Sequence, residues 1–225
     1  MMVKPEGGKI TMSLFIKRII FVCVCIVIGA IGVAFGLKAA VGIGAWDAIS
    51  QASSLVIGIK IGTFSMMMNI SCVLLQLVVL KKEFKPLFFL QIGMAVLLGY
   101  VVNIVFYDVL GSVVFNGYIL RLSVYVGSLF VIIIAVSLIM SIEFLSLPLE
   151  AACQAVAIKT TFSFSRLRQG VDLVSIVLAI ILSLLFSNPI PVREGTIIGM
   201  LLFGPMLGVF IPLFKPFVKK LGLVQ

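Results

Sequence analysis

The sequence predicts an all-α membrane protein with six transmembrane helices, arranged as two inverted three-helix repeats that each contain a short broken or re-entrant helix. Of the 225 residues, 62% are hydrophobic and 11% are charged, whereas a soluble domain carries about 25% charged residues. The apolar residues form six long runs, and the chain matches itself at one constant offset. We expect a single membrane domain over residues 1–225.

Six segments are long and apolar enough to cross a hydrocarbon core of about 30 Å at about 1.5 Å per helical residue. They are residues 19–37, 62–80, 87–106, 122–140, 171–187 and 196–214. Two apolar stretches between them, 39–60 and 142–168, are both interrupted by Ser, Gln and carboxylates, the first also by Gly and the second also by Pro. Each stretch is typical of a short half-helix or a re-entrant segment. The basic pair before the first run resembles a signal peptide, but the length of that run and the spans that follow favour a first transmembrane helix.

The basic residues predict that both termini lie in the cytoplasm, because cytoplasmic loops carry an excess of Lys and Arg. With an inner N-terminus, 13 of the 17 basic residues fall on the inner side. The inner residues are Lys4, Lys9, Lys17, Arg18, Lys81, Lys82, Lys85, Lys159, Arg166, Arg168, Lys215, Lys219 and Lys220, and the outer ones are Lys38, Lys60, Arg121 and Arg193. Topology therefore accounts for the net charge of +9, and we expect no nucleic-acid partner because no basic stripe is present.

The chain matches itself at an offset of 103 residues, so that repeat 1 covers about residues 16–106 and repeat 2 about residues 119–214. The polar matches carry the argument, because apolar residues match by chance in any membrane protein. The polar pairs are Asp47 with Glu150, Gln51 with Gln154, and Asn69 with Asp172. Because each copy contains three spans, an odd number, the second copy is expected to be inverted relative to the first.

Asp47 and Glu150 are the first candidates for a binding site, together with Trp46, Gln51 and Gln154 near them in the sequence. Transporters built from inverted repeats bind their substrates near mid-membrane, where interrupted helices meet, and ionisable side chains at that depth usually mark a substrate or ion path. The alternative for Asp47 is a helix start at the membrane interface, with Trp46 as an aromatic anchor. A glutamine one turn after each acid, Gln51 and Gln154, favours the functional interpretation.

Two further polar residues are binding candidates within the apolar runs. Asn69 lies inside the second run, where a buried amide needs a partner, and a polar seam between the repeats would supply one. Asp172 follows Arg168 by four residues, so a local ion pair is its default explanation.

The start of the last span offers a different kind of site. Arg193, Glu194 and Thr196 lie where free helix N–H groups and an arginine can hold an anion. A surface ion pair between Arg193 and Glu194, with Thr196 near the helix N-terminus, is the alternative.

The sequence favours neither a metal site nor an enzyme. The chain has no histidine, and its four cysteines form no C-x-x-C pair. A serine or cysteine in a recognisable nucleophile setting and a phosphate-binding glycine loop are also missing from the sequence. We therefore expect no catalytic residues, no bound metal and no cofactor.

Two motifs resemble a known family. "GIGAWD" at 42–47 and "VREGTIIGMLLFGP" at 192–205 are similar to motifs of the YczE-like family of bacterial integral membrane proteins, within the YczE/YyaS/YitT group. The resemblance implies a protein of the bacterial cytoplasmic membrane. It implies no substrate, because that family is largely uncharacterised, and its members commonly have proline where this chain has Ala45.

These observations lead to two competing functions. The first is a transporter or facilitator of an unidentified small solute, coupled to protons or sodium through Asp47 and Glu150. The second is a non-transporting membrane partner, either an assembly factor or the substrate-capture subunit of a larger transporter. The expected surroundings are the lipid bilayer, and a homo-oligomer or another membrane protein is compatible with both functions.

Overall fold

The computed structural model describes residues 12–224 as eight α-helices with three short 3₁₀ or π segments, and no β-strand occurs in this part of the chain. The first half contains α1 (Met12–Ala39), α2 (Ala45–Ile57), α3 (Ile61–Leu80), η1 (Lys81–Glu83), η2 (Pro86–Phe89), α4 (Leu90–Asn103) and the π-helix η3 (Ile104–Val109). The second half contains α5 (Tyr118–Ser141), α6 (Pro148–Lys159), α7 (Phe164–Leu185) and α8 (Glu194–Lys220).

Six helices are long and apolar enough to cross a membrane: α1, α3 with η1, α4 with η2 and η3, α5, α7 and α8. The six predicted spans are confirmed as such helices, so the chain has the character of a multi-pass membrane protein. The two short helices, α2 with 13 residues and α6 with 12, occupy the two stretches predicted to be interrupted. Neither is long enough to cross the hydrocarbon core.

The fifth long helix begins earlier than predicted, at Phe164 instead of residue 171. The Ser163 hydroxyl accepts a hydrogen bond from the Arg166 backbone N–H and so caps the helix. The helix therefore includes two polar turns before its apolar run, and Arg168 lies on the helix instead of in the preceding loop.

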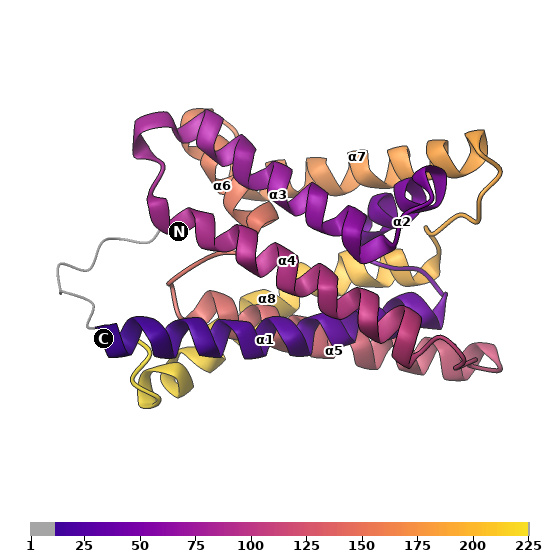
Figure 1. Ribbon diagram of the computed structural model, residues 1–225, viewed down its shortest axis with the longest axis horizontal. Coiled ribbons are helices and arrows are strands. Elements are labelled where there is room, and N and C mark those ends of the chain that lie inside the picture. The colour runs from indigo at the N-terminus through magenta and orange to yellow at the C-terminus, as the bar shows by residue number, and fades with distance from the viewer. Residues whose placement is uncertain (1–11, 225) are drawn as a thin grey trace.

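α1 and α5 pack antiparallel against each other (Figure 1). A Cβ at Gly36 would lie 3.0 Å from the Ser128 side chain, and a Cβ at Gly29 would lie 3.4 Å from Ala135. Small residues permit such close helix contact in membranes. Around this pair, α4 packs on α1 and α8 packs on α5, while α2 packs on α7 and α6 packs on α3.

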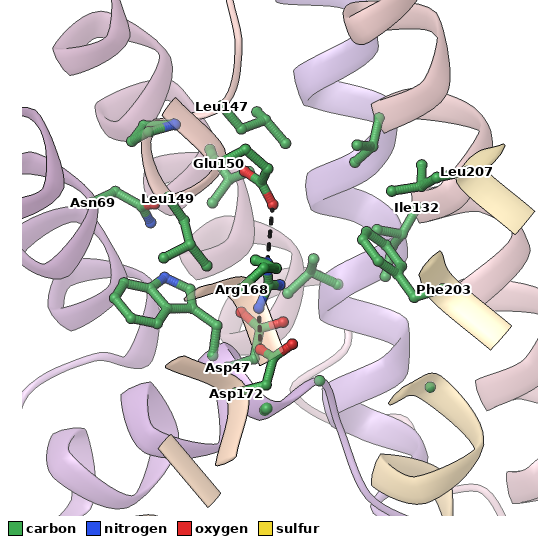
Figure 2. A pocket seen from close by; sticks show the side chains of 18 of the residues that line it. Asp47, Asn69, Ile132, Leu147, Leu149, Glu150, Arg168, Asp172, Phe203 and Leu207 are labelled. Atoms are coloured by element: carbon green, nitrogen blue, oxygen red, sulfur yellow. Dashed lines mark hydrogen bonds and ion pairs between the residues drawn. The ribbon is translucent and has the colours of Figure 1, made fainter. Parts of the chain in front are cut away.

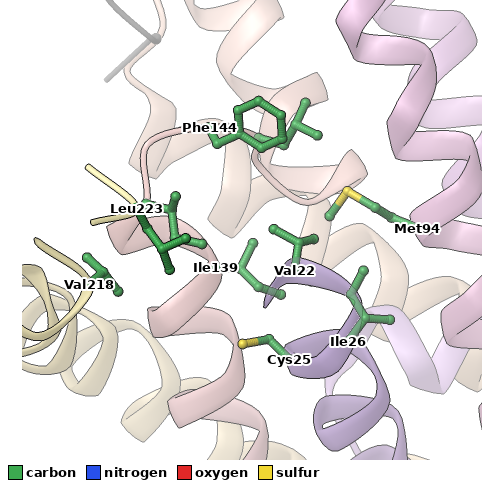
Figure 3. Packing of buried hydrophobic residues seen from close by; sticks show 10 residues of the cluster. Val22, Cys25, Ile26, Met94, Ile139, Phe144, Val218 and Leu223 are labelled. Carbon is green, nitrogen blue, oxygen red and sulfur yellow. The ribbon is translucent and has the colours of Figure 1, made fainter. Parts of the chain in front are cut away.

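One apolar core joins the first half of α1 to the last turn of α5 and the end of α8 (Figure 3). Its buried members include Val22, Cys25, Ile26, Met94, Ile139, Phe144, Val218 and Leu223. Arg18 is buried beside it, where its Nε donates to the Leu223 carbonyl at 2.7 Å and its guanidinium lies over the Phe144 ring. α1 therefore begins and α8 ends at the same end of the molecule. Lys4 and Lys9, which belong to the predicted inner group, lie outside the described residues.

α3 and α4 cross at two glycines. A Cβ at Gly62 would lie 2.1 Å from the Gly99 carbonyl oxygen, and a Cβ at Gly99 would lie 2.3 Å from the Gly62 carbonyl oxygen. The free N–H groups at the start of α3 are satisfied across this crossing, because Gly62 N donates to Asn103 Oδ1 at 2.9 Å and Ile61 N donates to the Tyr107 hydroxyl at 3.2 Å. Within residues 12–224, α7 and α8 do not pack against each other in this way.

The helix boundaries repeat the offset found in the sequence. α2 and α6 begin at residues 45 and 148, and α3 and α7 begin at residues 61 and 164, so both pairs are 103 residues apart. Asp47 and Glu150 are each the third residue of their short helix. The two acids thus occupy the same position in corresponding elements.

Candidate functional site

A cavity of about 410 Å³ lies in the interior, and all eight α-helices contribute to its lining. This volume falls within the range of about 300–1,000 Å³ that is usual for small-molecule sites. Much of its wall is apolar, including Ile132, Phe203 and Leu207, which lie opposite the charged side chains (Figure 2). The lining is therefore divided into a charged side and an apolar side.

Four charged side chains form the polar side: Asp47 of α2, Glu150 of α6, and Arg168 and Asp172 of α7 (Figure 2). The guanidinium of Arg168 donates to Asp172 Oδ1, and its Nε lies 3.7 Å from Glu150 Oε1. The predicted local pair of Arg168 and Asp172 is therefore present, and the same arginine also reaches the acid on α6.

Asp47 differs from the other two acids in having no partner. Among residues 12–224, no hydrogen bond or ion pair involves its carboxylate. The side chain lies in the first turn of α2, where the positive end of the helix dipole favours a negative charge. A free carboxylate thus faces the cavity.

The turn before α2 explains how Asp47 reaches the interior. Gly42 has φ +119°, which favours glycine, and a Cβ at this position would lie 2.6 Å from the Thr196 backbone nitrogen. The turn is therefore pressed against the start of α8, and it directs the N-terminal end of α2 towards the cavity.

Asp47 and Glu150 lie outside the six long helices, and burial dominates the pKa of both. Burial raises the pKa of Asp47 to about 6; Arg168 opposes this shift, while Asp172 and Glu150 add to it. Burial also raises the pKa of Glu150, again against the effect of Arg168. Asp47 therefore exchanges its proton just below neutral pH.

Trp46 and Asn69 also line the cavity. The Trp46 indole packs against a cluster that includes Leu149 and Cys153 of α6, and its buried Nε1 has no hydrogen-bond partner among residues 12–224. It therefore lies inside the protein and not at an exposed interface. Asn69 Nδ2 donates to the Ser65 carbonyl at 2.8 Å and to its hydroxyl at 3.3 Å. The expected partner across a seam between repeats is wrong for the Nδ2 donor, because Ser65, one turn earlier in the same helix, accepts from it.

Gln51 and Gln154 do not line the large cavity together with Asp47 and Glu150. Gln154 lines a separate cavity of about 30 Å³, where Gln76 Nε2 donates to Gln91 Oε1 at 2.8 Å. Gln51 lines neither cavity. The four-residue spacing places each glutamine one turn further along its helix, away from the end that meets the cavity.

Arg193, Glu194 and Thr196 also lie outside the large cavity. Arg193 Nη1 donates to the Ala40 carbonyl at 3.0 Å, and the hydroxyl of Thr196, which is fully buried, accepts from the Ile43 backbone N–H at 3.3 Å. Glu194 is exposed. These hydrogen bonds connect the motif at 192–205 to the motif at 42–47 and to the residue Ala40 shortly before it. Anion binding there stays a prediction.

Arg168 is the charged cavity residue that the sequence did not mark as a binding candidate. A signal for it exists at the offset of 103, where Arg168 and Asp172 correspond to Ser65 and Asn69. Both pairs line the cavity, and in each pair the two residues, which are one helical turn apart, form a hydrogen bond. A hydrogen-bonded pair of residues therefore recurs at corresponding positions of α3 and α7.

Comparison with known proteins gives one match. The model of a family of unknown function, DUF6198, matches residues 16–212, which include every residue that lines the large cavity. No curated protein and no solved structure matches the chain. The match does not test the resemblance to the YczE-like group, which stays a prediction. Because the matched segment covers most of the 225 residues, the chain belongs to DUF6198, a family of unknown function.

Proposed function

We propose that the protein is a small-molecule transporter of the bacterial cytoplasmic membrane, with its substrate site in the large cavity between two inverted repeats. One observation carries this proposal: Asp47 and Glu150, the third residues of two short helices, line the same cavity. Secondary transporters commonly bind their substrates where the ends of interrupted helices meet.

The packing of the helices supports an inverted duplication. If α1 to α4 correspond to α5 to α8, then the pair α1–α4 corresponds to α5–α8, and α2–α7 corresponds to α6–α3; all four pairs pack against each other. α1 and α5 are antiparallel, as two copies of opposite orientation require. α2 and α6 lie towards opposite ends of the molecule (Figure 1).

One difference between the halves supports a route into the cavity. α3 and α4 are in close contact at Gly62 and Gly99, whereas α7 and α8 make no comparable contact in the described residues. The exposed residues of the cavity lining are Gly44, Phe164, Met200 and Gly204, and three of these four belong to α7 and α8. In the proposed transporter, this arrangement is the open state, and closure brings α7 towards α8.

The proposal places in the cytoplasm the end of the molecule where α1 begins and α8 ends. This end carries Arg18, Lys219 and Lys220. Leu87 and Phe88, which follow the basic η1 segment, pack against the same apolar core. The excess of positive charge at one end supports a cytoplasmic position for both termini.

Thiol labelling tests alternating access without knowledge of the substrate. In a background with Cys23, Cys25, Cys72 and Cys153 replaced, a single cysteine is placed by Asn69→Cys, which lies on the cavity wall midway along α3. A membrane-impermeant maleimide is applied to intact spheroplasts and to inside-out vesicles. A transporter is expected to show labelling of Asn69→Cys from both sides.

Two control positions calibrate the labelling. Met67→Cys lies on the same helix but is 57% exposed on its outer surface, so lipid protects it from either side. Asp108→Cys lies in η3 at the end proposed to be outside, so it is labelled in spheroplasts only. Labelling of Asn69→Cys from one side alone, or from neither, contradicts the transporter and favours a non-transporting membrane partner.

A further inference from the structure

We propose that the large cavity binds an apolar organic monocation, with the positive centre beside Asp47 and the apolar body against α5 and α8. This inference rests on the proposed function, because it names the class of substrate for the same cavity.

The charges of the cavity lining favour a cation. Among the described residues, the lining contains three carboxylates and a single basic side chain, Arg168. That arginine is already bound to Asp172 and Glu150. Asp47 therefore has no direct ion pair among residues 12–224, and only the through-space effect of Arg168, which two other acids share, offsets its charge. A bound cation supplies the opposite charge that a buried carboxylate needs. A bound anion meets an uncompensated negative charge instead.

The rest of the lining favours a ligand with one charge and an apolar body. Ile132, Phe203 and Leu207 face the charged group across the cavity (Figure 2), and they offer no partner for polar groups on a ligand. Burial of unpaired polar groups is costly, so a ligand with several charges or hydroxyl groups fits this wall poorly. The inferred ligand thus carries a single positive charge on an otherwise apolar body.

The indole of Trp46 is a second feature of the cavity lining that suits a cation. It lines the cavity next to Asp47. Aromatic faces attract cations, and tryptophan does so best. An adjacent indole and an unpaired carboxylate together favour a positive centre at this position.

Two ions of the same shape and opposite charge test the inference. The full-length protein is placed in lipid nanodiscs, and saturable binding of tritiated tetraphenylphosphonium and of tetraphenylborate is compared at pH 7.5, with empty nanodiscs as the blank. We expect saturable binding of tetraphenylphosphonium only. Asp47→Asn is expected to weaken it about tenfold or more, the effect of about 1.4 kcal/mol in binding free energy.

Asp108→Asn is the matched control, because it makes the same chemical change at an exposed residue that does not line the cavity. It is expected to bind tetraphenylphosphonium like the unmodified protein. The comparison of the two ions uses the unmodified protein, so the inference stays testable even if Asp47→Asn does not fold.

Three outcomes overturn the inference: equal binding of both ions, unchanged affinity in Asp47→Asn that folds normally, and no saturable binding of either ion. None of them decides whether the protein transports, since thiol labelling at position 69 requires no ligand. Failure of the substrate class and failure of the transporter are therefore distinguishable.

Discussion

Arg168 and Glu150 join α7 to α6 at the cavity wall, with the Nε of the arginine 3.7 Å from Oε1 of the glutamate. Both side chains are mostly buried, with 21% and 12% of their surfaces exposed. Breaking a buried ion pair by removing one partner is strongly destabilising, because the other charge stays buried and uncompensated. The pair is thus a point where charge, stability and the shape of the cavity depend on each other.

We predict that Arg168→Gln destabilises the protein by about 3 kcal/mol at pH 7.5 and by less at pH 5. Burial raises the pKa of Glu150 above its usual value, and loss of the arginine raises this pKa further. The folded state then binds a proton more tightly than the unfolded state, so a lower pH favours the folded variant. Thermal unfolding in detergent at both pH values measures the difference. Arg166→Gln, an exposed arginine on the same helix, is the control, and an equal loss at both pH values contradicts the prediction.

Cation binding is predicted to depend on pH through Asp47. Its pKa is about 6, so the carboxylate is mostly protonated at pH 5 and mostly ionised at pH 7. Affinity for tetraphenylphosphonium is expected to rise about tenfold over this interval and to level off above it.

The groups that face Asp47 are Arg168 and Asp172 from α7, Glu150 from α6 and Tyr125 from α5. Asp47→Asn removes the carboxylate of Asp47 and leaves these four groups in place. Its binding is expected to change little with pH, and a curve that keeps the full tenfold rise assigns the dependence to another group.

The crossing of α3 and α4 is predicted to tolerate no side chain. Gly62→Ala puts a methyl group where the Gly99 carbonyl oxygen lies 2.1 Å away, so the helices must separate, at a cost of about 1–3 kcal/mol or more. Gly93→Ala on α4 is the control, because nothing lies within 4 Å of its added methyl group. The temperature of thermal unfolding is expected to fall for Gly62→Ala and to stay equal or rise slightly for Gly93→Ala.

Substitutions at two glycines of α8 distinguish an effect on the volume of the cavity from an effect on the stability of the helix. A Cβ at Gly204 or at Gly208 meets no atom within 4 Å, but only Gly204 lines the cavity. Gly204→Leu is expected to reduce tetraphenylphosphonium binding by about tenfold or more, whereas Gly208→Leu preserves it. Similar loss in both variants indicates an effect on the helix and not on the cavity.

Thr196→Val tests the connection between the two sequence motifs. The change removes an oxygen that accepts hydrogen bonds from the backbone N–H groups of Ile43 and Arg193, both at 3.3 Å. Leaving these two donors unpaired, of which that of Ile43 is buried, is expected to lower the free energy of unfolding by about 1–3 kcal/mol. Thr196→Ser keeps the hydroxyl and is expected to retain most of the stability. An equal loss in the two variants points to the methyl group instead of the hydrogen bonds.

Long-range apolar patterns made much of the fold predictable. The six spans follow from the length of apolar runs, and the two short helices follow from the glycines, prolines and carboxylates that interrupt the stretches between spans. The candidate site was partly predictable for a related reason: Asp47 and Glu150 are polar residues in apolar surroundings, and both line the cavity.

The pairing of polar side chains was less predictable, because it depends on distances between helices. Arg168 binds Glu150 from a different helix, and nothing in local spacing indicates that contact. The same limit applies to Asn103, which satisfies the start of α3 from the end of α4. Asn69 is the opposite case, because a partner on another helix was predicted and its Nδ2 donates to Ser65 on its own helix instead.

The glycine contact between α3 and α4 implies that the two halves of the proposed transporter differ in which helices can move. At the offset of 103, Gly62 of the third helix corresponds to Ser165. In the fourth helix the offset is 106, as the match of Ile92-Gly93-Met94 with Ile198-Gly199-Met200 shows, so Gly99 corresponds to Pro205. Serine and proline cannot bring α7 and α8 equally close. In the proposed transporter, α3 and α4 then form a side of the cavity that stays fixed, and α7 and α8 form the side that moves. New substrate preferences can accordingly arise by changes in α7 and α8, while α3 and α4 keep their arrangement.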